Sequence, residues 1–138
     1  MSDILISIHG RHVAKSLDGS KTFELRRQFH FKHEGAWLWI YETSPTCSVV
    51  AVAYVAALIN TPPNSVWRSW SRFGFGVTRE EYDEYFAGCK TAWAIGITAV
   101  KKLTTPITLT EMRAAGIQPP QSYRTVPAEI AAQWEAKR

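Results

Sequence analysis

The segment from Cys47 to Leu58 is a continuous run of apolar residues, most of which favour β-structure. Because successive side chains of a strand point to opposite faces, such a run predicts a strand buried on both faces. Thr61-Pro62-Pro63-Asn64 ends the run, and a second long strand is predicted from Thr91 to Leu103, before a turn at 104–106. Long apolar strands with few hairpin signals would aggregate at open edges, so we expect a small closed barrel.

Shorter elements complete this barrel. Strands are predicted over 4–8 and 37–41, and a helix over 11–17. Thr78 begins another helix, where Glu81 completes a capping box. The predicted fold is mostly β with α (α+β), a closed barrel of five or six strands with three or four short peripheral helices. The 138 residues predict a single domain with its core over 4–126, followed by a C-terminal helix or tail over 127–138.

Charge and composition narrow the class of partner. The net charge of +4 favours an acidic partner such as nucleic acid, or it serves solubility. Cys47 and Cys89 form no Cys-x-x-Cys pair, which predicts reduced thiols and a cytoplasmic setting. The chain begins Met1-Ser2-Asp3 before a predicted strand, and its longest apolar run is far shorter than a membrane span, so neither a signal peptide nor a membrane partner is expected.

The four histidines form two pairs, His9 with His12 and His30 with His33. A spacing of three residues can place two imidazoles on one helix face, as in metal sites. No carboxylate or thiolate stands at a recognisable ligand spacing from either pair. We therefore predict neither a metal site nor a cofactor.

The stretch 18–27 combines a turn at Asp18-Gly19 with a lysine, a glutamate and two arginines. Alternation predicts a half-buried strand on which Thr22, Glu24 and Arg26 share one face, with Lys21 at its start. This face is either an ion-pair network or a functional site.

Several blocks of the chain resemble the ASCH (activating signal cointegrator homology) family, which has a PUA-like fold. The resemblance covers about 4–126 and rests on blocks of similar type and order, which are Leu5-Ile6-Ser7-Ile8-His9, Gly19 to Arg27, Tyr41 to Pro45, Thr78 to Gly88, Ala92 to Ile95 and Pro119 to Arg124. It implies a small bacterial, archaeal or phage protein that binds RNA, or a modified nucleobase, in a cleft beside the barrel.

In this family the cleft would be lined by the strand of Lys21, Glu24 and Arg26 and by the turn at Thr43-Ser44, and closed by 121–124. The predicted ligand-binding residues are therefore Lys21, Glu24, Arg26, Thr43, Ser44, Gln121, Ser122 and Arg124. Glu24 and Gln121 would read a base edge, while Lys21, Arg26 and Arg124 would hold phosphate, and Trp39, Trp93 or Tyr123 would stack on a ring. Alternatively, Gln121 and Ser122 satisfy backbone groups in a turn.

An enzyme is the alternative. One bacterial ASCH group acts as an N4-acetylcytidine amidohydrolase with a lysine, a threonine nucleophile and a glutamate, and other members are ribonucleases. The lysine corresponds to Lys21, but Glu24 stands at the nucleophile position, so Thr22 would have to replace it. In a ribonuclease, Lys21 and Glu24 would act as acid and base.

Two further segments bear on how a nucleic acid would approach. Aromatic residues and arginines alternate over 65–75, where helical spacing favours packing on the barrel over an exposed stacking surface. The acidic residues that follow Thr78 predict a solvated face that repels phosphate, so nucleic acid is expected to approach from elsewhere.

Overall fold

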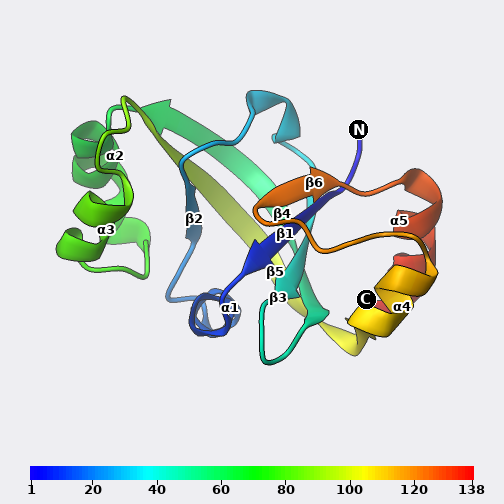
Figure 1. The fold of residues 1–138 in the computed structure, drawn as a ribbon. Helices are drawn as coiled ribbons and strands as arrows, with labels where there is room; N and C mark the ends of the chain where they lie inside the picture. Colours follow the sequence, from blue (N-terminus) through cyan, green and yellow to red (C-terminus); the bar gives the residue numbers. More distant parts are fainter.

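A single six-stranded sheet organises the chain in the computed structural model, which describes residues 1–138 (Figure 1). Its strands are β1 (Ile4–Ile8), β2 (Phe23–Arg26), β3 (Trp37–Glu42), β4 (Ser48–Thr61), β5 (Ala92–Thr108) and β6 (Tyr123–Thr125). The order across the sheet is β2-β5-β4-β3-β1-β6, and every neighbouring pair is antiparallel except β1 and β3. The α+β class and the strand number are as predicted.

The sheet curls into a half-barrel and does not close. The β4–β5 ladder shifts register at several bulges, which bend both strands around the core. β2 and β6 are the two edges and do not pair with each other. The prediction of a closed barrel was therefore wrong. The edges are only four and three residues long, and short edges offer little surface for aggregation, so closure is not needed to protect them.

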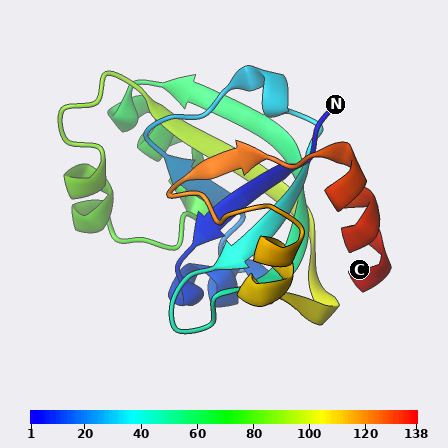
Figure 2. The ribbon, with the colours of Figure 1, turned by 45° about the vertical axis from the view of Figure 1, so that its right-hand side comes forward.

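Five α-helices and three 3₁₀ turns surround the sheet, more than the predicted three or four helices (Figures 1 and 2). The helices are α1 (Gly10–Asp18), α2 (Pro63–Trp70), α3 (Arg79–Tyr85), α4 (Leu109–Ala114) and α5 (Ala128–Trp134), and the 3₁₀ turns are η1 (Phe31–His33), η2 (Ser71–Phe73) and η3 (Glu135–Lys137). α2 and α3 lie on one side of the sheet, and α4 and α5 lie on the opposite side (Figure 1). The predicted capping box is present at Thr78 and Glu81.

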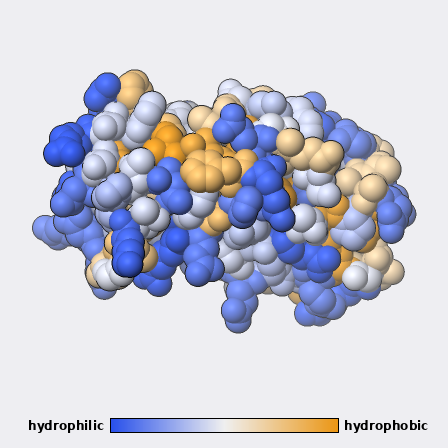
Figure 3. Space-filling model, turned by 90° about the horizontal axis from the view of Figure 1, so that it is seen from above, coloured by the Kyte–Doolittle hydropathy of each residue, from blue (hydrophilic) through white to orange (hydrophobic).

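Burial on both faces of the long strands is confirmed in the first half of β4. Val49 and Val52 pack with α4 and α5 in one core, whereas Val50 and Ala53 pack in the core that contains Val13 of α1. A third core joins β2 to α2 and α3. From above, the surface is hydrophilic over most of its area, with apolar atoms gathered left of its centre (Figure 3). None of the helices combines the length and apolar character needed to span a membrane.

Two segments differ from the prediction. The expected turn at 104–106 is a bulge inside β5. The pairing of β5 with β4 stops after Lys102 and resumes at Ile107. The aromatic segment over 65–75 was predicted either to pack on the barrel or to form an exposed surface, and it does both in part. Phe75 is 2% exposed and packs in the core, whereas Phe73 is 49% exposed. Of the residues at helical spacing, Val66 is buried but Trp70 and Phe73 are exposed, so the spacing predicted packing correctly only at Val66.

Candidate functional site

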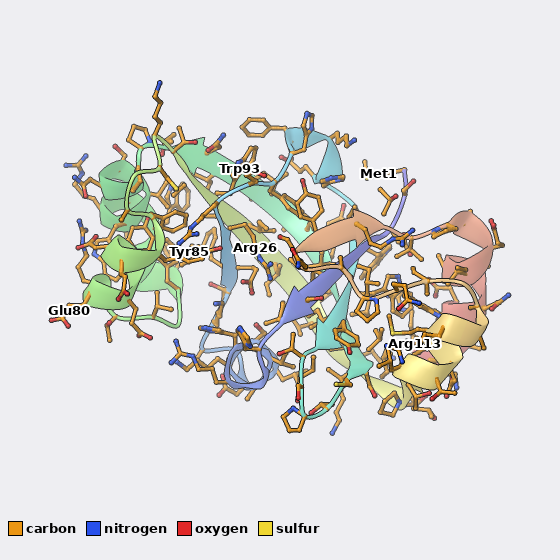
Figure 4. All side chains as sticks on the ribbon, viewed as in Figure 1. Met1, Arg26, Glu80, Tyr85, Trp93 and Arg113 are labelled. Carbon is orange, nitrogen blue, oxygen red and sulfur yellow. The ribbon has the colours of Figure 1, made fainter.

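A cleft of about 590 Å³ opens along β2, between β1, α1 and α3. We call it the main cleft. It lies at the seam where the half-barrel does not close. Side chains of β2 occupy the space that hydrogen-bonded strands would fill in a closed barrel. Figure 4 shows Arg26 and Tyr85 flanking β2, with Arg26 on the side of β1. The open seam of the sheet is thus the site.

Lys21, Glu24 and Arg26 form a buried ionic group on the cleft wall. Lys21 Nζ lies 3.9 Å from Glu24 Oε2, and Arg26 Nε lies 3.5 Å from Glu24 Oε1. The three side chains are only 2%, 6% and 12% exposed, so two cations share one carboxylate away from water. Burial lowers the pKa of Lys21, although the charge of Glu24 acts in the opposite direction. The group therefore carries excess positive charge that an anionic ligand would compensate.

His12 of α1 contacts the lysine directly. Its Nδ1 lies 3.1 Å from Lys21 Nζ, and its Nε2 lies 3.3 Å from Arg11 Nε. Burial, together with the charges of Lys21 and Arg11, lowers the pKa of His12 from 6.5 to about 4. His12 is therefore a neutral imidazole at pH 7 and can accept a proton.

The Arg26 side chain links the edge strand β2 to β1 and to Ser122, which directly precedes the other edge strand, β6. Its Nη2 donates to the Ser7 carbonyl of β1 at 2.7 Å, and its Nη1 donates to Ser122 Oγ at 3.3 Å. Ser7 Oγ in turn donates to the Pro120 carbonyl at 2.6 Å. Because its terminal nitrogens are engaged in this way, Arg26 is placed to position Ser122 and Glu24. In its predicted role as a phosphate ligand, Arg26 would use the N–H groups that these two bonds leave free.

The acidic helix α3 forms the opposite wall of the main cleft, and its acidic residues are exposed to solvent, as predicted. Glu81, Glu84 and Tyr85 line the cleft. Arg11 crosses from α1 and donates to Glu81 at 2.7 Å. The backbone N–H of Thr78 and the Arg11 guanidinium lower the pKa of Glu81 to about 2, so this carboxylate stays ionised and paired. The phosphate repulsion expected of this helix is thereby reduced.

An aromatic side chain is available on the α3 wall. Tyr85 is 36% exposed, and the Arg27 guanidinium lies 4.6 Å from its ring centroid. The aromatic residues predicted to stack on a base do not line the cleft. Trp39 is fully buried in the opposite core, and Trp93 and Tyr123 pack around Phe29. Trp39 is therefore out of reach of a ligand in the cleft, whereas Tyr85 is an exposed aromatic side chain of the lining.

Five of the predicted ligand-binding residues line the main cleft, and they are Lys21, Glu24, Arg26, Thr43 and Gln121. Thr43 is held there by His9, whose Nδ1 lies 3.1 Å from its Oγ1. Ser122 joins the site through Arg26. Ser44 and Arg124 are exposed and lie outside the lining, so the structure does not bring them to the site.

Thr22 lies outside the cleft lining as well. It precedes β2, and its hydroxyl donates to the Phe73 carbonyl. A hydroxyl that is committed to a carbonyl and remote from the cleft is poorly placed for nucleophilic attack. The amidohydrolase alternative thus loses the residue that would have replaced the missing threonine.

The sequence did not lead us to His9, His12 and Arg11 as site residues. The spacing of His9 and His12 was noticed but weighed only as a metal signal. No group of three or more His, Cys, Asp or Glu side chains is arranged to hold a metal ion. A histidine three residues after another, on a helix leading into the Lys21 turn, was the signal available for an acid–base role.

No family model matches the chain. An ASCH domain-containing ribonuclease of Zymomonas mobilis subsp. mobilis is 31% identical over 122 residues, which cover 87% of this chain and 81% of the relative. The crystal structure of ASCH from Zymomonas mobilis has a TM-score of 0.89 and 28% identity, and covers 98% of this chain and 94% of its own.

Two variants of the Zymomonas mobilis protein, one with tyrosine changed to phenylalanine and one with serine changed to alanine, give the same TM-score of 0.89. The N-terminal domain of Staphylothermus marinus McrB has a TM-score of 0.59 at 7% identity and shares the fold alone.

The fold and the site together define a small α+β protein whose curled, half-open sheet carries a basic cleft at its seam. The sequence relationship is more specific. The chain belongs to the ASCH domain family, as the sequence blocks indicated.

Proposed function

We propose that this protein binds single-stranded RNA in the main cleft and cleaves its phosphodiester backbone. The observation that carries the proposal is the pairing of a buried lysine with a neutral histidine, Lys21 and His12, on the wall of a cleft with excess positive charge. The ribonuclease of the same family, related over most of the chain, supports this assignment.

The roles follow from the chemistry of the two side chains. His12, neutral at pH 7, accepts the proton of the attacking 2′-hydroxyl, whose oxygen bonds to phosphorus as the bond from phosphorus to the 5′-oxygen breaks. The leaving 5′-oxygen takes a proton from water. The Lys21 ammonium donates to the phosphoryl oxygen on which negative charge develops, and its burial strengthens that interaction. Glu24 raises the pKa of Lys21 against the effect of burial, and so helps to keep it protonated.

The remaining residues bind and orient the strand. Arg27 and Tyr85 offer a cation and an aromatic face to a phosphate and a base. Gln121 presents an amide that can read a base edge, and Arg26 holds the neighbouring Ser122.

The test is incubation of the purified protein with a short single-stranded RNA, with the products separated by chromatography. We expect shortened oligonucleotides, and we expect binding to weaken steeply as salt rises, because phosphate contacts release counterions. Single-stranded RNA that stays intact and shows no salt-sensitive binding would contradict the proposal.

The pH dependence of kcat/KM reports on the proposed acid–base pair in the free protein. Because the pKa of His12 is about 4, we expect kcat/KM to stay constant from pH 7 down to pH 5 and to fall only as pH approaches 4. Because burial lowers the pKa of Lys21, we expect the alkaline limb to fall below the ordinary lysine value of 10.5. An acid limb centred at the ordinary histidine value of 6.5 would exclude His12 as the proton acceptor.

A further inference from the structure

A second hollow adjoins the main cleft. It has a volume of about 350 Å³ and is lined by the 71–72 and 74–78 segments together with Lys15 and Glu81. We call it the side groove. Val77 and Glu81 line both hollows, so the two meet beside the first turn of α3.

The side groove is cationic. Lys15 and Arg72 line it, and neither forms an ion pair with a carboxylate. Lys15 Nζ donates to the Gly76 carbonyl at 2.8 Å, which leaves two of its N–H groups for a ligand. The only carboxylate in the lining is Glu81, which Arg11 already neutralises. Charge therefore favours an anionic occupant along the whole path between the two hollows.

An exposed aromatic residue stands at the edge of the side groove. Phe73 adjoins the lining residues Arg72 and Gly74, and 49% of its surface is exposed. The Arg72 guanidinium lies 4.5 Å from its ring centroid. A cation held on an exposed aromatic ring offers a phosphate contact and a stacking face together, the combination that binds single-stranded nucleic acid without sequence preference.

Gly76 allows the wall of the side groove to pack close to Lys21, the proposed catalytic lysine. A Cβ atom at Gly76 would lie 3.0 Å from Lys21 Cδ, and Gly76 has a positive φ of 70° that favours glycine. The strip that forms the side groove is thus packed directly behind Lys21. A strand leaving the lysine has only this short distance to cross before it meets the second set of cations.

We infer that the side groove binds the nucleotides next to the cleaved bond, so that a single-stranded RNA runs from the main cleft past Glu81 to Arg72 and Phe73. This inference rests on the proposed function and adds a second binding site to it. The site contributes affinity for longer strands and takes no part in the chemistry.

The experiment compares an RNA dinucleotide with an eight-nucleotide RNA, for wild type and for Arg72→Ala, Phe73→Ala and Arg68→Ala. Arg68 is the matched control, because it is exposed on α2 and does not line the groove. For the longer RNA we expect Arg72→Ala to lower the salt slope of binding by about one and Phe73→Ala to weaken binding about fivefold. Cleavage of the dinucleotide should stay at the wild-type rate in all three variants.

A wild type that cleaves the dinucleotide but gains no affinity with length would overturn the side groove and leave the proposed function standing. Equal effects of Arg72→Ala and Arg68→Ala on the longer RNA would overturn it as well. Inactivity of wild type toward both RNAs would overturn the proposed function together with this inference.

Glu81→Gln is expected to strengthen binding of the eight-nucleotide RNA, whereas Phe73→Ala is expected to weaken it. Glutamine retains the capping box with Thr78 and removes the negative charge at the junction, which frees Arg11 for phosphate. We expect the eight-nucleotide RNA to bind more tightly than it binds to wild type. Unchanged or weaker binding of the longer RNA would contradict a path past Glu81.

Discussion

Replacing Lys21 with methionine is expected to lower kcat/KM for single-stranded RNA by at least about a hundredfold while the protein stays folded. Lys21 is the buried cation that contacts His12, and no other lysine lines the main cleft. Methionine fills a similar volume without charge. Its introduction leaves one arginine and one glutamate in the buried group, a balanced pair, so folding should survive.

Lys102→Met is the matched control, because Lys102 is exposed on β5 and lies outside the main cleft. It should retain wild-type cleavage, and both variants should show a cooperative thermal transition. Cleavage by Lys21→Met within a factor of about three of wild type would remove Lys21 from the chemistry, since general acid–base groups contribute far more than that.

The strand that carries Glu24 and Arg26 was predictable because its signal is local. Alternation over 22–27 places Glu24 and Arg26 on one face whatever the rest of the chain does, and both do face the site. Thr22 has the same parity, yet it stands before the first ladder residue and its hydroxyl turns to Phe73, 51 residues away. Strand periodicity therefore predicted side-chain direction only for the residues that lie within β2.

The partners of these side chains depend on contacts far apart in the sequence. Arg26 bonds Ser122 across 96 residues, and Arg11 bonds Glu81 across 70 residues. Such pairings follow from the curl of the sheet and from the placement of α1 across the cleft from α3, which no local pattern encodes. The exposed face and the first turn of α3 were predicted correctly, but its place on the cleft wall was not.

The closed barrel was predicted because open strand edges would aggregate, and this prediction was wrong for a related reason. Long apolar strands do require protection, but β4 and β5 obtain it as neighbours inside the sheet. The actual edges are the short strands β2 and β6, which carry little hydrophobic surface. The sheet can then stay open at its seam, and the site occupies that opening.

Replacing Glu24 with glutamine is expected to destabilise the protein by about 3 kcal/mol, because two buried cations would lose their only carboxylate. Equilibrium unfolding in urea measures the change. Glu34→Gln, at an exposed glutamate that forms no ion pair, should stay within about 0.5 kcal/mol of wild type. Because Glu24 raises the pKa of Lys21, its loss lowers that pKa further below the unfolded value. The unfolded chain then binds the proton more tightly, so the stability of Glu24→Gln should rise with pH.

The double variant Lys21→Met/Glu24→Gln separates charge balance from simple loss of contacts. If excess buried positive charge is the cause, removing one cation should restore part of the lost stability, and the double variant should be more stable than Glu24→Gln alone. If Glu24 acts only through its own contacts, the two substitutions should destabilise additively. Partial restoration would show that the native group holds one cation more than its carboxylate balances, a charge that a phosphate of the proposed RNA ligand would compensate.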